Sequence, residues 1–131
     1  LDRSSSGLIL LTNDGRWSER LMHPTQKVAK VYRVETRTPI PASAVRAFER
    51  GFHFASEGIV TQPANLEILN AHLARVTIHE GRYHQIKRMF HRVDGIRLKS
   101  LHRESIGRIQ LPQDLDSGAW RELRADEIEF D

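Results

Sequence analysis

The chain contains no cysteine, which excludes disulfide bonds, thiolate metal ligands and cysteine nucleophiles. It has no apolar run close to the ~20 residues that a membrane-spanning helix needs, so we expect no membrane association. No segment has the glycine spacing of a phosphate-binding loop. Aromatic residues are few, at 7% of the chain. The lack of cysteine is typical of a protein from a reducing compartment.

What the chain does contain is enough for one folded unit. Its 131 residues predict a single domain. Hydrophobic residues make up 39% and charged residues 28%, a balance typical of a chain that buries a core. The sequence predicts helices and strands that are interspersed along the chain, with hairpin-like turns between them. We therefore expect an α+β protein with a mixed, mainly antiparallel sheet flanked by helices.

The apolar pattern predicts the individual elements. Strands are expected at residues 8–11, 28–34, 59–60, 66–69, 74–78, 96–106 and 109–111. Helices are expected at residues 17–22, 41–48, 83–93 and 125–130. The helix at 83–93 has the clearest apolar stripe, with residues at i, i+3, i+7 and i+10: Tyr83, Ile86, Phe90 and Val93.

Positive charge is concentrated in the middle of the chain. The net charge is only +3, but 16 of the 20 basic residues are arginine. Residues 75–108 carry 9 basic and 3 acidic side chains, whereas residues 109–131 carry 2 basic and 7 acidic ones. An arginine-rich block of this kind suits a phosphate-bearing polyanion. The alternative is a solvated charged surface without a partner.

The same block puts one cationic face on the helix expected at 83–93. The face consists of His84, Lys87, Arg88 and His91. It favours contact with a nucleic-acid backbone, although a solvated helix face or stabilisation of the helix C-terminus explains it equally well. Tyr32 and Tyr83 could stack on a base or could be ordinary core aromatics.

Two other catalytic patterns fit poorly. His79 and His84 flank Glu80 as in a metalloprotease helix, but they are five residues apart instead of four, with Gly81 between them. A metal hydrolase is therefore the weakest hypothesis, and we expect no metal. The serines at positions 4–6 before Gly7 do not form the G-x-S-x-G turn of a serine hydrolase.

Four stretches together resemble the pseudouridine synthases of the RsuA type. They are LDRSSSGLILLTNDG at 1–15, KVYRV at 30–34, EGRYHQIKRMF at 80–90 and LHRESIG at 101–107, in order and with suitable spacing. The resemblance implies the pseudouridine synthase catalytic fold. It also implies that residues 1–131 are the catalytic domain, without the further N-terminal segment and the small N-terminal RNA-binding domain that the family normally has.

Carried over by position, the resemblance assigns site residues. Asp2 would be the catalytic aspartate, Lys87 its basic partner, and Tyr32 the tyrosine that packs against the target base. Ile86 would be an apolar wall of the pocket. Three arginines would hold RNA or the framework of the site: Arg82, Arg88 and Arg103. The sequence departs from the family at Ser4, a turn position where a second aspartate is common.

The implied activity is the isomerisation of one uridine to pseudouridine in ribosomal RNA. The stretches at 82–90 and 101–107 favour the branch that modifies small-subunit 16S rRNA. The alternatives are a synthase acting on 23S rRNA and a non-catalytic RNA-binding module. The resemblance further implies a cytoplasmic, monomeric enzyme that needs no cofactor, because the reaction oxidises nothing and adds no group.

Overall fold

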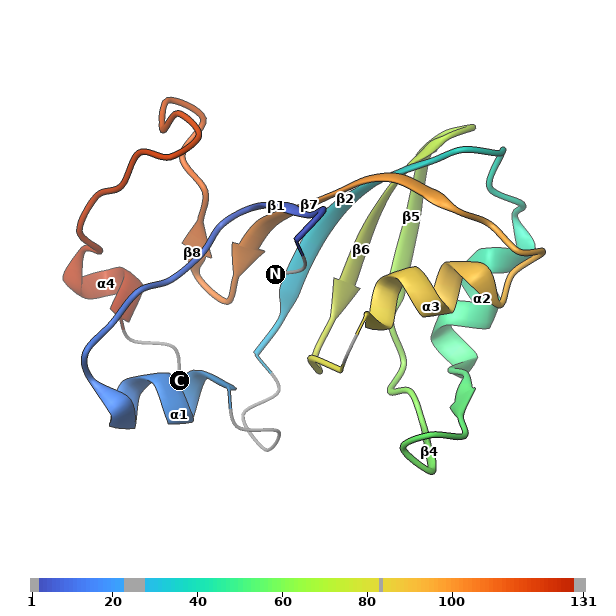
Figure 1. The fold of residues 1–131 in the computed structure, drawn as a ribbon, viewed down its shortest axis with the longest axis horizontal. Helices are drawn as coiled ribbons and strands as arrows, with labels where there is room; N and C mark the ends of the chain where they lie inside the picture. The colour runs from blue at the N-terminus through green and yellow to red at the C-terminus, as the bar shows by residue number, and fades with distance from the viewer. Residues whose placement is uncertain (1–2, 23–27, 83, 129–131) are drawn as a thin grey trace.

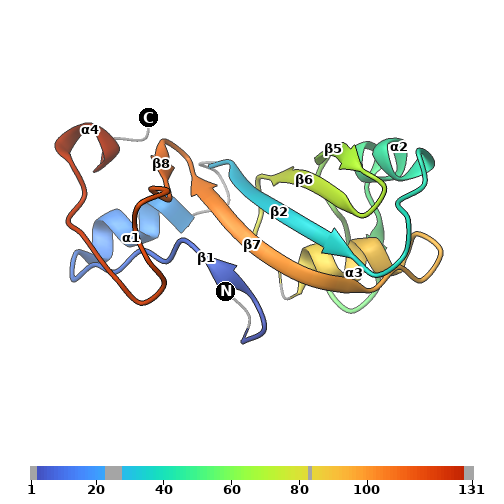
Figure 2. The same cartoon turned by 90° about the horizontal axis from the view of Figure 1, so that it is seen from above.

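The computed structural model describes residues 3–22, 28–82 and 84–128. Its six-stranded sheet runs in the order β1 (Ser6–Gly7), β7 (Leu98–Ile106), β2 (Lys30–Thr36), β6 (Leu73–Ile78) and β5 (Asn65–Asn70), with β8 (Ile109–Gln110) also paired to β7 (Figures 1 and 2). Only the β1–β7 pair of this sheet is parallel among the described strands. The predicted α+β class with a mixed, mainly antiparallel sheet is confirmed.

Four helices and a small hairpin complete the described part of the chain. The helices are α1 (Gly15–Met22), α2 (Ser43–Arg50), α3 (Gln85–His91) and α4 (Ala125–Ile128), and β3 (His53–Phe54) pairs with β4 (Ile59–Val60). Figure 1 shows α2 and α3 near the β5 side of the sheet and α1 and α4 near β8. Within the described residues, no helix has the length and apolar character needed to cross a membrane.

The main core lies between the sheet and the helices α2 and α3. Alternate residues of β2 are buried, and Val34 is completely enclosed. The rings of Phe48 on α2 and Phe90 on α3 meet at 4.9 Å between centroids. Burying each such ring contributes about 1.5–3 kcal/mol. This packing fixes the position of α3 against the central strands.

The N-terminal strand is joined tightly to β7. Ser6 lies opposite His102 and Gly7 opposite Arg103, and the amide of Leu8 donates a 2.9 Å hydrogen bond to the carbonyl of Arg103. Gly7 has a φ of +108°, and a Cβ at this position would collide with the backbone of Arg103. Only glycine therefore allows β1 to approach β7 this closely.

The prediction of a buried strand at residues 8–11 is wrong. β1 ends at Gly7, and only Leu8 is buried, in a second small core with Leu21, Ile106 and Ile109. Ile9 and Leu11 are 61% and 88% exposed. The turn signal that follows is a helix cap: Asp14 Oδ1 accepts hydrogen bonds from the backbone amides of the first turn of α1.

The other predicted strands and helices are found, the strand at 59–60 with the predicted bounds and the rest with shifted ends. The strand predicted at 28–34 begins at Lys30, and the helix predicted at 83–93 spans only Gln85–His91. His84 precedes this helix with left-handed dihedral angles, φ 47° and ψ 37°, so it does not belong to a helical cationic face. Tyr83 and the residues after Ile128 lie outside the described residues.

Candidate active site

A cavity of about 190 Å³ opens where β2, β7 and the start of α3 meet. Five of the seven site residues expected from the sequence line it: Tyr32, Arg82, Ile86, Lys87 and Arg103. They come from three segments that are far apart in the sequence and that the sheet brings together. The cavity is thus the place where the expected site residues meet.

The apolar part of the cavity is formed by buried side chains. Tyr32 is 8% exposed on β2, and Ile86 is 3% exposed in the first turn of α3.

Lys87 follows Ile86 and is exposed at the cavity. Asp2 lies outside the described residues, whereas Ser5, three positions later, is on the cavity wall.

Arg103 supports the cavity from β7. Its Nε and Nη2 atoms donate hydrogen bonds of 2.9 and 2.6 Å to the carbonyl oxygen of Leu8. The backbone of Arg103 also accepts a hydrogen bond from the amide of Leu8. Side chain and backbone together hold the N-terminal segment at the edge of the cavity, so the geometry gives Arg103 a framework role.

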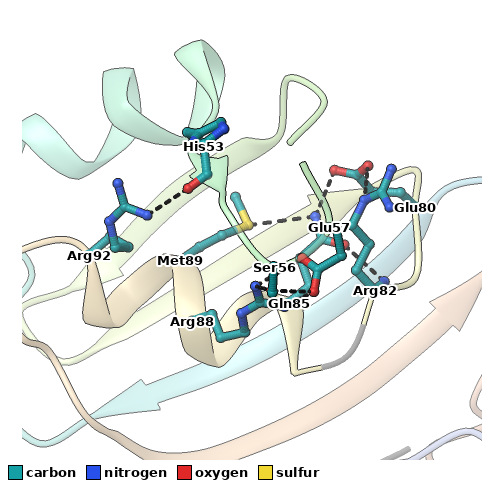
Figure 3. Close-up of polar contacts among 9 residues, drawn as sticks. All are labelled: His53, Ser56, Glu57, Glu80, Arg82, Gln85, Arg88, Met89 and Arg92. Carbon is teal, nitrogen blue, oxygen red and sulfur yellow. Dashed lines mark hydrogen bonds and ion pairs between the residues drawn. The ribbon is translucent and has the colours of Figure 1, made fainter. Parts of the chain in front are cut away.

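Arg88 does not line this cavity. Its guanidinium group donates to both carboxylate oxygens of Glu57 at 2.9 and 3.3 Å (Figure 3). It also lies 3.8 Å over the ring of Phe54. The hydrogen bonds from Arg88 and then from Ser56 hold the pKa of Glu57 below its ordinary value. Arg88 therefore ties α3 to the β3–β4 hairpin, which accounts for one member of the expected cationic face.

The loop before α3 is held by one carboxylate. Glu80 Oε1 accepts a hydrogen bond from Gln85 Nε2 at 2.8 Å, and Oε2 accepts one from Arg82 Nε at 3.2 Å (Figure 3). Oε1 also accepts a hydrogen bond from the Gln62 amide at 2.7 Å. Gln85 returns a bond by accepting from the Arg82 amide. This network, which we call the Glu80 buckle (Gln62, Glu80, Arg82 and Gln85), fixes the loop that carries Arg82 to the cavity.

The Glu80 buckle also bears on the metal hydrolase hypothesis. Both carboxylate oxygens of Glu80 already accept hydrogen bonds, and its side chain is only 8% exposed. In the described ranges, no group of three or more histidine, aspartate or glutamate side chains is arranged to hold a metal. The geometry gives the pairing of His79, Glu80 and His84 no support as a metal site.

The sequence patterns assigned no role to Lys30, which the structure places on the wall of this cavity. Lys30 is 6% exposed and forms part of the wall of this cavity and of a second one of about 160 Å³. Burial, and then the charge of Arg103, lower the pKa of Lys30, and Glu80 acts in the opposite direction. The available signal was its position two residues before Tyr32, on the same face of β2.

Known proteins similar to this chain match it over the segments that form the cavity. A family model described as RNA pseudouridylate synthase matches residues 1–92. "Ribosomal small subunit pseudouridine synthase A" of Pseudomonas aeruginosa is 53% identical over 128 residues, covering 98% of this chain and 55% of that protein. The proteins of the same name from Vibrio cholerae and Escherichia coli K12 are 43% and 42% identical over the same shares of both chains.

A solved structure agrees with the described fold. The crystal structure of a pseudouridylate synthase matches with a TM-score of 0.95 at 40% sequence identity. The match covers 99% of this chain and 56% of that one. The chain thus spans a little over half the length of these similar proteins.

Proposed function

Because the chain belongs to the RNA pseudouridylate synthase family, we propose that it is the catalytic domain of an enzyme that converts a uridine of small-subunit 16S rRNA to pseudouridine in the cytoplasm. The names of its relatives support the small-subunit substrate. The observation that carries the proposal is the single cavity shared by Tyr32, Ile86 and Lys87.

The cavity has a suitable size for one nucleobase. A protein cavity of about 150 Å³ accommodates benzene, so about 190 Å³ is adequate for the six-membered ring of uracil with its two oxygens. The target base must leave the RNA stack to enter, at a cost of a few kcal/mol. Packing against Tyr32 returns about 1–3 kcal/mol, which offsets much of this cost.

The catalytic role falls to Asp2 in this proposal. Ser5 on the cavity wall follows Asp2 by three positions, and three residues span at most about 11 Å. The carboxylate of Asp2 would attack the sugar carbon C1′ or remove a proton beside it, and both steps release the base. Lys87 at the cavity would keep this carboxylate ionised by its positive charge.

The arginines divide into two groups. Arg82 lines the cavity, where its charge suits a phosphate that flanks the target nucleotide. Arg103 also lines the cavity, but its side chain is bound to the Leu8 carbonyl, so we assign it to the framework of the site. Arg88 is bound to Glu57, so we assign it to the framework that holds α3. The isomerisation consumes no oxidant and transfers no external group, so these side chains provide the functions that the reaction requires without a cofactor.

The test is Asp2→Asn in the complete gene product that carries this chain, assayed for pseudouridine formation in 16S rRNA. We expect the single-turnover rate to fall ~1000-fold or more, with RNA affinity unchanged. Asp116→Asn, in an exposed loop, is the matched control and should keep full activity. Retained activity of Asp2→Asn would remove Asp2 from the catalytic role.

Parallel assays separate the competing functions. Pseudouridine in 23S rRNA and not in 16S rRNA would change the substrate but keep the chemistry. If the wild-type protein binds rRNA tightly and never forms pseudouridine in either RNA, the protein is a non-catalytic binding module.

A further inference from the structure

Lys30 is a buried cation whose ammonium group has no hydrogen-bond or ion-pair partner among the described residues. The residue is only 6% exposed. Buried charges in proteins are normally paired. Every fully enclosed side-chain nitrogen or oxygen of the described residues has a hydrogen-bond partner, so the Lys30 Nζ atom is not fully enclosed. Lys30 lines two cavities, and the first of them is the one that it shares with Tyr32.

The described residues around Lys30 supply little negative charge. Glu80 is the acidic group among them that acts on Lys30, but both Glu80 oxygens are held by the Glu80 buckle. Burial, and then the charge of Arg103, lower the pKa of Lys30. Within the described residues the ammonium group therefore has no acceptor, and a molecule that enters the cavity can supply one.

The position of Lys30 beside Tyr32 identifies what enters. The two residues are neighbours on the same face of β2, about 7 Å apart along the strand. With uracil packed against Tyr32, as the proposed function requires, the long Lys30 side chain reaches the edge of the base. That edge carries the carbonyl oxygens O2 and O4.

We propose that the Lys30 ammonium donates a hydrogen bond to a carbonyl oxygen of uracil and stabilises the negative charge that the base acquires when its glycosidic bond breaks. This inference rests on the proposed function and adds to it a catalytic residue that contacts the base. The stabilisation is electrostatic: a donor is held in place where charge develops, inside a site with little water.

The electron count of the step is simple. The C1′–N1 bond breaks and its electron pair stays on N1, so the free base is an anion with its charge shared by O2 and O4. Lys30 gives up no proton and only donates its hydrogen bond. C5 then bonds to C1′. In the first route of Asp2 this displaces its carboxylate from C1′, and in the second the proton that Asp2 removed returns to the sugar. C5 loses its proton and N1 is protonated in the product, so the atoms and charges of uridine and pseudouridine balance.

The first test is Lys30→Met in the complete gene product, with 16S rRNA and single-turnover kinetics. We expect the rate to fall about 100- to 1000-fold, as for loss of an oxyanion donor, while RNA affinity changes less than about threefold. Replacing a buried charged side chain with an apolar one of similar length usually preserves the fold. Arg50→Met, at the exposed end of α2, removes a cation outside the cavity and should keep the activity.

The second test varies the leaving base. Fluorine at C5 withdraws electrons and stabilises the uracil anion by itself, so Lys30→Met should slow glycosidic cleavage less in rRNA with 5-fluorouridine at the target position. If Lys30→Met slows glycosidic cleavage by the same factor with uridine and with 5-fluorouridine, the proposal is overturned. Lys30→Gln, which keeps a neutral donor, should recover part of the activity; a variant as slow as Lys30→Met also counts against it.

Two further outcomes are decisive. Lys30→Met could instead move the acidic limb of the pH–rate profile to higher pH. In that case the Lys30 ammonium keeps the Asp2 carboxylate ionised and does not stabilise the base, and the proposal is wrong. If the wild-type protein forms no pseudouridine, the proposed function itself fails, which is distinguishable because the wild-type rate is measured first.

Discussion

The ammonium group of Lys30 occupies the space beside Gly81. A Cβ at position 81 would lie 3.1 Å from Lys30 Nζ, closer than ordinary van der Waals contact. Gly81 belongs to the loop that the Glu80 buckle holds, so the absence of a side chain there leaves room for the buried cation. The contact links the loop before α3 to the strand that carries Tyr32.

Gly81→Ala should therefore impair activity more than stability. The methyl group must push the flexible end of Lys30 by a few tenths of an ångström, which moves its ammonium within the cavity. We expect the single-turnover rate to fall about tenfold and the free energy of unfolding to change by less than ~1 kcal/mol. Gly15→Ala, where a Cβ meets nothing within 4 Å, is the control and should change neither quantity.

Removing the carboxylate of Glu80 should loosen the loop that carries Arg82. Glu80→Ala leaves the Gln62 amide and Gln85 Nε2 without their acceptor, and we expect a loss of about 3 kcal/mol in unfolding free energy. Amide exchange of residues 80–85 should accelerate. If urea unfolding and exchange are both unchanged, the Glu80 buckle does not hold the loop.

Much of the fold follows from local sequence patterns. Alternating apolar residues predicted β6, and the helical stripe that contains Ile86 and Phe90 predicted α3, because burial of one face determines both patterns. The error at residues 8–11 has a tertiary cause. Leu8 and, in part, Leu10 pack into a second core outside the sheet, while Ile9 and Leu11 are exposed. No local pattern distinguishes such a segment from a buried strand.

The site was less predictable than the fold. Lys87 and Arg88 are adjacent and belong to the same expected cationic face, so the charge pattern alone did not separate them, whereas the resemblance gave them different roles. In the structure Lys87 lines the cavity and Arg88 is bound to Glu57, 31 positions away. Such a distinction depends on which loop packs beside the helix. Lys30 was missed for a similar reason: a lysine next to buried residues is usually solvated, and only the tertiary structure encloses it.

Arg103 should hold the N-terminal strand in place. Arg103→Met removes both hydrogen bonds to the Leu8 carbonyl, and we expect a loss of about 1–3 kcal/mol in unfolding free energy. Exchange of the Leu8 amide should become faster, because β1 pairs with β7 over only two residues. Arg103→Lys keeps the charge but not the two-pronged geometry and should recover only part of the stability. If the Leu8 amide of Arg103→Met exchanges its hydrogen at the wild-type rate, Arg103 does not hold the N-terminal strand in place.

Acid should release the C-terminal segment. Hydrogen bonds from Arg121, and then from the Arg124 amide, lower the pKa of Glu127 from 4.5 to about 2. Since the folded pKa is the lower one, Glu127 contributes its full stability above about pH 4.5 and loses it as the pH falls towards 2. α4 is also joined to α1 by a hydrogen bond from Trp17 Nε1 to the Ile128 carbonyl, so Trp17 reports on the loss.

Glu127→Gln tests this assignment directly. The variant should be less stable than the wild type at pH 7, and the difference between them should shrink between pH 4.5 and 2, because the wild-type carboxylate becomes protonated there. Urea unfolding followed by tryptophan fluorescence at several pH values measures both. Glu122→Gln, an exposed neighbour, should behave as the wild type throughout. A stability difference that stays constant down to pH 2 would show that the Arg121–Glu127 pair does not set the acid response of this end of the chain.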